Sequence, residues 1–255
     1  MKIHKILSTW FTLVVVILAL LVYLGVERIR SSSAFQPAQA PTFGARGTYA
    51  TNFPAAENPI SEAHNWVTGR AAGLDWADVR TTAGLAFGTE AGAVLYDDST
   101  ALLVGNWGPD QMTEAAVRTA NQTDAFSEEV ELRLRSSLSP HSATGYEVNF
   151  RCSKTANAYT EIVRWNGPLG SFTYLKRMRG SKFGVKDGDV IKATVIGNVV
   201  TAYINGVQVI QVRDATYQAG SPGMGFYNNG NAAANGDFGY ASFRASDQWA
   251  ASSAR

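Results

Sequence analysis

From Tyr49 onward, apolar and polar residues alternate with a period of two, and Gly, Asn, Asp or Pro interrupts the alternation about every 8 to 12 residues. This period predicts β-strands, whereas the periodicity of a helix is nearly absent. Short strands at such spacing are typical of antiparallel sandwiches and barrels. The clearest strands are predicted over Glu129–Arg135, Gly145–Cys152, Tyr159–Trp165, Phe172–Lys176, Asp189–Ile196, Val199–Ile204 and Val207–Val212.

The strongest local signal is the run Ile204-Asn205-Gly206-Val207. A two-residue type I′ turn needs positive φ at both central positions, and Asn-Gly adopts such angles at little cost. Similar turns are predicted at Lys186-Asp187-Gly188-Asp189 and at Ile196-Gly197-Asn198, so residues 189–212 should form a meander of three strands.

The N-terminus carries an uncharged hydrophobic run over residues 6–26, preceded by Lys2 and Lys5. As a helix this run would be about 30 Å long, which matches the hydrocarbon core of a bilayer. We expect an uncleaved signal anchor over residues 1–30, with a cleaved signal peptide as the alternative. Residues 31–47 then predict a flexible linker, 48–246 the folded domain and 247–255 a C-terminal tail. Both alternatives place the domain outside the cytoplasm, in the periplasm or at the cell surface.

Composition narrows the classes of partner. The net charge is +1 and no block of Lys and Arg occurs, so nucleic acid is not an expected partner. The hydrophobic share of 45% is enough for a packed core. Cys152 is the one cysteine and cannot form an intramolecular disulfide. It shares an apolar face with Val148 and Phe150, which predicts a buried, unreactive thiol.

Several stretches together resemble the concanavalin A-like lectin/glucanase superfamily, in its laminin-G-like jelly-roll branch. The resemblance extends over residues 50–245. It rests on Asn52-Phe53, Asn58-Pro59-Ile60 and Asn65-Trp66; on Gly145-Tyr146-Glu147 and Trp165-Asn166-Gly167; on Gly188–Ala193 and Ala202–Val207; and on Thr216-Tyr217, Gly220–Gly223, Gly225–Tyr227, Asp237-Phe238 and Ala241–Phe243. It implies an all-β antiparallel jelly-roll β-sandwich with two curved sheets, in which glycans usually meet the concave face.

The catalytic motif that this resemblance implies is not intact in this chain. Laminarinase-like members carry Glu-x-Asp-x-Glu or Glu-x-Asp-x-x-Glu on one strand. Here the run reads Glu129-Val130-Glu131-Leu132-Arg133-Leu134, with Glu in place of Asp and with Arg133 or Leu134 in place of the acid. The face continues with Arg135, and such a row of alternating acids and bases is typical of solvated surface. No catalytic residue is therefore predicted.

Other chemistries have weaker signals. A polysaccharide lyase needs a Tyr or His base beside groups that neutralise a uronate, and the residues expected to face away from the core are Arg133, Arg135, Asn149, Arg151 and Arg164. They are interleaved with glutamates, and no paired His is found. No Ser-His-Asp order, phosphate-binding glycine loop or zinc-ligand spacing occurs. Calcium is the one metal that the oxygen-bearing side chains would suit, with Asp97 and Asp237 as the first candidates.

Aromatic residues beside planar polar side chains suit glycan binding, because sugars present C–H patches and hydroxyl rims. The predicted ligand-binding residues are Trp107, Trp165, Tyr227, Asn228, Asn149, Arg151 and Arg164, while Trp66 and Trp76 are assigned to the core. The leading hypothesis is a membrane-anchored, noncatalytic carbohydrate-binding domain. One alternative is an accessory subunit that binds membrane-protein partners through the sandwich and the helix, and the other is a divergent polysaccharide hydrolase or lyase.

Overall fold

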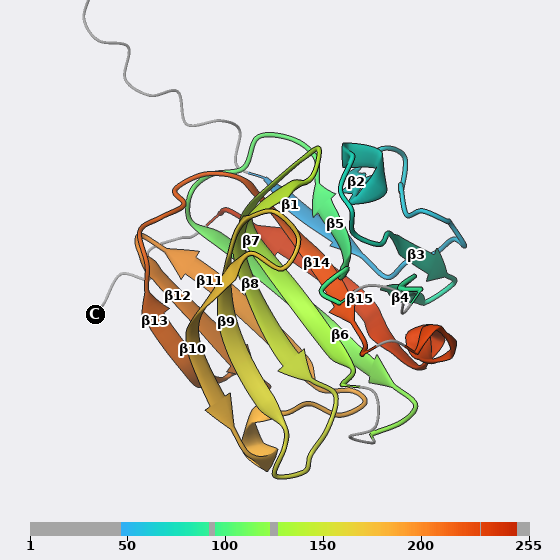
Figure 1. Cartoon of the computed structure of the whole chain (residues 1–255), viewed down its shortest axis with the longest axis vertical. Helices are drawn as coiled ribbons and strands as arrows, with labels where there is room; N and C mark the ends of the chain where they lie inside the picture. The colour runs from blue at the N-terminus through green and yellow to red at the C-terminus, as the bar shows by residue number, and fades with distance from the viewer. Residues whose placement is uncertain (1–46, 92–94, 123–126, 230, 249–255) are drawn as a thin grey trace, which may run out of the picture. The chain divides into compact units, whose positions relative to one another are not determined.

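A computed structural model describes residues 47–248, apart from 92–94, 123–126 and 230. Within these residues two antiparallel β-sheets pack face to face, as the alternation predicted (Figure 1). The hydrophobic run at residues 6–26 and most of the predicted linker lie outside the described residues. In the part of the chain that is described, no helix has the length and apolar character needed to cross a bilayer.

The first sheet has eight strands in the order β13-β12-β11-β6-β15-β4-β3, with β1 also paired to β15. Its strands are β1 (Thr48–Thr51), β3 (Val79–Thr82), β4 (Leu85–Gly88), β6 (Gln111–Thr119), β11 (Val190–Ile196), β12 (Val199–Ile204), β13 (Val207–Arg213) and β15 (Phe238–Ser246). The second sheet has seven strands in the order β10-β9-β8-β7-β14-β5-β2. These are β2 (Trp66–Thr68), β5 (Ser99–Leu103), β7 (Glu129–Ser139), β8 (Ser142–Arg151), β9 (Tyr159–Gly167), β10 (Phe172–Arg179) and β14 (Ser221–Tyr227).

The strands predicted from alternation are confirmed, with ends that differ by a few residues; β7, for example, continues to Ser139 rather than ending at Arg135. The turn between β12 and β13 has φ of 52° at Asn205 and 79° at Gly206, as a type I′ turn requires. Three short 3-10 helices complete the described elements: η1 (Arg70–Ala72), η2 (Ser181–Phe183) and η3 (Ala232–Asp237).

The main hydrophobic core lies between the two sheets. On β7 the inward residues are Val130, Leu132 and Leu134, which are fully buried. The inward residues of β8 continue to Cys152, whose side chain is buried as predicted. Burial raises the pKa of the Cys152 thiol well above its usual value, which keeps the thiol protonated.

A smaller hydrophobic cluster covers part of the outer face of the seven-stranded sheet. It contains Leu74, Trp76, Ala143, Val163 and Trp165. Val163 and Trp165 alternate along β9 with the inward-facing Ile162, so they must point away from the main core. Trp66 belongs to the main core and Trp76 to this outer cluster. The outer cluster closes one end of the region described below as the candidate site.

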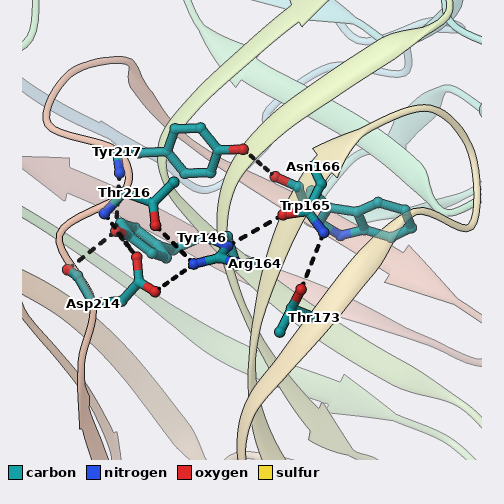
Figure 2. A network of polar contacts seen from close by, with 8 residues as sticks. All are labelled: Tyr146, Arg164, Trp165, Asn166, Thr173, Asp214, Thr216 and Tyr217. Carbon is teal, nitrogen blue, oxygen red and sulfur yellow. Dashed lines mark hydrogen bonds and ion pairs between the residues drawn. The ribbon is translucent and has the colours of Figure 1, made fainter.

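A polar network joins the segment between β13 and β14 to strands β8 and β9 (Figure 2). The hydroxyl of Tyr146 donates to Asp214 Oδ1 at 2.7 Å and accepts from the backbone N–H of Tyr217 at 3.1 Å. Arg164 Nη1 donates to Asp214 Oδ2 and to Thr216 Oγ1, both at 2.7 Å, and the Tyr217 hydroxyl donates to the carbonyl of Trp165 at 2.7 Å. The network therefore fixes this segment against the sheet.

We predict that Asp214→Ala destabilises the protein by about 1–3 kcal/mol, because it leaves the buried Tyr146 hydroxyl and Arg164 without their acceptor. The free energy of unfolding in urea measures this loss. Glu114→Ala is the matched control, since Glu114 forms a partly exposed ion pair with Arg244 on the other sheet and should contribute less. Equal losses in the two variants would contradict a stabilising role for the network.

Candidate functional site

A cleft of about 280 Å³ opens on the outer face of the seven-stranded sheet. Strands β7 to β10 and β14 supply its floor, and the segment before β5 supplies a wall. The residues that line it are Leu95, Tyr96, Asp98, Ser127, Glu129, Glu131, Glu147, Asn149, Tyr159, Glu161, Val163, Trp165, Phe172, Tyr174, Arg177, Tyr227 and Asn229. Five of these are carboxylic acids and six are aromatic, so the cleft combines acceptors with flat apolar surfaces.

Strand register explains why the carboxylates meet. On β7 the outward positions alternate with the inward ones, so Glu129 and Glu131 share a face, as predicted. Glu131 is paired across the ladder with Asn149 on β8, and Asn149 is paired with Glu161 on β9. These three side chains form a row across the floor, because residues opposite each other in neighbouring strands point the same way.

The prediction that this row is a solvated surface is wrong. Glu131, Arg133 and Glu147 are 1%, 2% and 2% exposed. Loop residues cover them: Trp76 places its ring 5.0 Å from the guanidinium carbon of Arg133, and Asp98 approaches from the segment before β5. Sequence alternation gives the face of a residue but not whether a distant loop lies over that face.

Arg133 holds the buried carboxylates together. Its guanidinium contacts Glu147 at 2.6 Å, Glu131 at 2.8 Å and Asp98 at 3.4 Å. Burial, followed by the neighbouring carboxylates, raises the pKa of Asp98 and Glu131 well above their usual values, although Arg133 opposes the shift. The cluster is therefore close to neutral in spite of its composition.

A glycine on β14 provides room for this cluster. Gly225 lies opposite Glu131 in the ladder. A Cβ atom at this position would lie 2.2 Å from Glu131 Oε2 and 3.0 Å from Arg133 Nε. Any side chain there would displace the carboxylate from the guanidinium, so the Gly at position 225 is required by packing rather than by a turn.

The open end of the cleft holds a second set of polar contacts. Tyr159 donates a short hydrogen bond to Glu129, and Arg177 forms an ion pair with Glu161. Burial is the main cause that raises the pKa of Glu129 to about 8, and the Glu161 carboxylate adds to the shift. Burial also raises the pKa of Tyr159 far above its usual value, so this hydroxyl is a donor and not a base.

Aromatic rings form the wall on the β10 side. Phe172 packs edge-on against Tyr96, Tyr174 and Trp165, with ring centroids 5.1 to 5.2 Å apart. Tyr96 and Tyr174 are 42% and 49% exposed, so their rings are available to a ligand. Trp165 is buried and donates its Nε1–H to Glu147 at 2.6 Å, which ties the aromatic wall to the charged floor.

The structure brings together some of the predicted ligand-binding residues. Trp165, Tyr227 and Asn149 all line the cleft. Arg151 lies at its edge, with the guanidinium carbon 5.5 Å from the centroid of the Tyr159 ring. Asn149 is 7% exposed, and its Oδ1 has no hydrogen-bond partner among the described residues. An unpartnered buried acceptor in a cleft is the polar group most readily completed by a ligand.

Three predicted residues lie elsewhere. Trp107 packs partly against the main core and donates to the carbonyl of Val104. Asn228 is buried and donates to Glu90 and Asn235, so it has a structural role. Arg164 is two residues from the inward-facing Ile162 and therefore points to the core side of β9, where it binds Asp214 (Figure 2). The prediction that Arg164 faces outward is therefore wrong, because residues two apart on a strand lie on the same face.

Arg135 also leaves the outer face, against the prediction. Its φ is 46°, and the ladder between β7 and β8 shifts register between Leu134 and Ser137. This bulge turns the side chain toward the eight-stranded sheet, where Arg135 donates to the carbonyl of Gly197 at 2.8 Å. The row of acids and bases therefore ends at Arg133.

The calcium candidates are not brought together. Asp237 accepts from Asn121 at 2.7 Å, and Asp97 is not part of its surroundings. Within the described ranges, the one group of three carboxylates whose oxygens lie within 4.8 Å of one another is Asp98, Glu131 and Glu147. The guanidinium of Arg133 contacts all three, so a cation of the protein itself already balances this group.

Neither the profiles of known protein families nor the curated protein sequences give a match to the chain. Solved structures do match. The metal-free carbohydrate recognition domain of Emp46p has a TM-score of 0.53 at 12% identity, over 79% of this chain and 97% of that one. The fold is a concanavalin A-like jelly roll.

Two further solved structures match with lower TM-scores. The carbohydrate binding module CBM66 from Bacillus subtilis is 16% identical over 73% of this chain and 94% of that one, with a TM-score of 0.48. The Crh5 transglycosylase in complex with NAG is 13% identical over 82% and 88% of the two chains, with a TM-score of 0.44.

Sequence reasoning missed Tyr159, Asp98 and Arg177 as residues of the cleft. A signal for Tyr159 was present, because it is two residues before Glu161 and so shares its outward face. The sequence holds no such signal for Asp98, because its position depends on how the segment before β5 folds over the sheet. The bulge in β10 between Tyr174 and Lys176 places Arg177 on the same face as Tyr174, which simple alternation from Tyr174 would not predict.

We predict that Arg133→Met destabilises the protein by about 3–5 kcal/mol near pH 8, because three buried carboxyl groups lose their cation. The loss should be smaller near pH 5, where protons can replace that charge. Unfolding in urea at the two pH values measures the difference. A loss that is the same at both would contradict the electrostatic role of Arg133.

The raised pKa of Glu129 predicts a pH-dependent stability. Between the ordinary Glu pKa and about 8, the folded state binds the Glu129 proton and the unfolded state has released it, so stability falls as the pH rises through this window. Glu129→Gln should flatten this part of the fall in the free energy of unfolding. Glu114→Gln, which alters a partly exposed carboxylate on the other sheet, should leave the slope unchanged.

Proposed function

We propose that this domain binds glycans in the cleft on the outer face of its seven-stranded sheet. The observation that carries the proposal is the joint presence in one cleft of exposed aromatic rings and an unsatisfied buried amide, at Tyr96, Tyr174 and Asn149. Sugars need both, because their C–H faces stack on rings while their hydroxyl groups form directional hydrogen bonds. The shared fold with a carbohydrate recognition domain is consistent with the proposal.

The polar groups of the cleft favour glycan binding over glycan cleavage. Glycoside hydrolysis by two carboxylates needs one of them to deliver a proton to the leaving oxygen. At the position where a laminarinase-like strand carries that acid, this chain has Arg133, which is buried and ion-paired. A lyase needs a base, and Tyr159 holds its proton in a hydrogen bond to Glu129. We therefore propose a noncatalytic binding function.

We predict that Tyr174→Ala and Asn149→Ala each weaken glycan binding about tenfold or more, through loss of an exposed ring or of a hydrogen-bonding amide. A glycan array identifies the ligand, and calorimetric titration of the full chain measures the affinities. A polyoxyethylene detergent is suitable for the hydrophobic N-terminus, because it carries no sugar that could compete.

Tyr203→Ala is the matched control, since Tyr203 is a partly exposed aromatic residue of the other sheet, beside Lys192. It should leave the affinity unchanged. Reducing ends and unsaturated uronates are measured in the same samples. Release of either product would overturn the noncatalytic function, and equal weakening by all three variants would move binding away from the cleft.

We also propose that the domain lies outside the cytoplasm, anchored by the hydrophobic run at residues 6–26. The support is the length of this uncharged run in the sequence. Mass spectrometry of the mature N-terminus distinguishes an anchor, which retains the run, from a cleaved signal peptide, which loses it.

A further inference from the structure

The cleft has many more hydrogen-bond acceptors than donors. Five carboxyl groups line it, and a carboxylate offers about four lone-pair sites. The positively charged donors that face them are already engaged, Arg133 with three of the acids and Arg177 with Glu161, and Tyr159 donates to Glu129. The charged groups of the cleft therefore suit a ligand that brings a positively charged donor.

Acceptors converge on one place in the cleft. Asn149 lies between Glu131 and Glu161 in the strand register. The residue is only 7% exposed, and its Oδ1 has no hydrogen-bond partner among the described residues. Tyr159 engages Oε1 of Glu129, and Arg177 engages Oε1 of Glu161. The second oxygen of each carboxyl group can still accept once the group is ionised. Three acceptors from three strands thus border the same space.

The charges around this space favour a cation. Glu129, Glu131 and Glu161 face it from β7 and β9. Asp98 and Glu147 lie behind them, already balanced in part by Arg133. The other cations are two arginines of β10 and one of β8: Arg177 is paired with Glu161, Arg179 lies 5.8 Å from the centroid of the Tyr159 ring, and Arg151, opposite Glu129 in the ladder, lies 5.5 Å from it. Five carboxyl groups thus face four arginines, and a bound cation would favour the ionised form of those that carry a proton.

We infer that the saccharide bound in this cleft carries an unacetylated amino group, whose ammonium is held by Asn149, Glu129 and Glu161. The inference rests on the proposed glycan-binding function and specifies its ligand class. An ammonium group has three donors and no acceptor, which matches the three acceptors that border the space. Its hydrogen bonds to carboxylates are charge-assisted and are stronger than those of a hydroxyl.

Before a ligand binds, Glu129 carries a proton near neutral pH. Because burial raises the pKa of Glu129 to about 8, its carboxyl group is mostly protonated at pH 7. An arriving ammonium stabilises the carboxylate and drives that proton into solvent. Binding of an amino sugar should therefore release protons near pH 7, whereas binding of a neutral sugar should not.

The test compares oligosaccharides of equal length and linkage that differ at one substituent: free amine, N-acetyl amine or hydroxyl. Glucosamine, N-acetylglucosamine and glucose oligomers form one such set, and the galactose equivalents form a second. Calorimetric titration of the full chain, in two buffers with different ionisation enthalpies, gives both affinity and proton release. We expect the amine form to bind at least about tenfold more tightly and to release protons.

Variants assign the effect to the cleft. Glu129→Gln keeps the shape of the side chain and an acceptor for Tyr159 but removes the charge. It should weaken binding of the amine form about tenfold and leave that of the acetylated form unchanged. A structural defect would weaken both equally. Asn149→Ala is the second variant, and Glu114→Gln, on the other sheet, is the control that should have no effect.

Each other outcome counts against the inference. If acetylated or neutral sugars bind as tightly as the amine form, the amino-group inference fails while glycan binding stands. If an oligolysine of equal charge binds more tightly than any saccharide, the ligand is a cationic peptide. If no glycan on the array and no oligosaccharide of either set binds, the proposed function fails as well.

Discussion

The guanidinium of Arg133 is the interaction on which the polar face of the sandwich depends. Asp98, Glu131 and Glu147 lie close enough together that their oxygens fall within 4.8 Å, and three such carboxylates could not be buried side by side without a cation. The planar fork of an arginine can contact several carboxylates at once, which a lysine cannot do with one ammonium. Trp76 then shields the group from water on its open side.

This buried cation divides the outer face of the sheet into two parts. At the Trp76 end, ion pairs and aromatic packing fill the space and leave little capacity to bind anything. At the Glu129 end, the acids are neutralised mainly by protons and by edge arginines, and Asn149 keeps an unsatisfied oxygen. The closed part fixes the geometry of the floor, and the open part has the free polar groups. One fold thus supplies both rigidity and a surface for a ligand.

Much of this architecture could be predicted from the sequence, and the site could be predicted only in part. Alternation assigned Glu129 and Glu131 to one face, because strand geometry alone decides that. The Asn205-Gly206 turn was equally determined by local chemistry. Burial of Arg133 was not, since it depends on loops distant in the sequence. Arg135 turned inward because a bulge broke the alternation, and bulges have no reliable signature in a single sequence.

Arg133 also marks the position at which this strand departs from the glucanase motif. In a Glu-x-Asp-x-Glu strand of the laminarinase-like type, the third outward position, counted from the first glutamate as one, supplies a proton to the leaving oxygen. In this chain that position is Arg133, whose guanidinium does not release its proton in proteins. A group that would have changed charge during a reaction is replaced by a fixed charge. In the binding function that we propose, the remaining acids would respond to a bound ligand by gaining or losing protons.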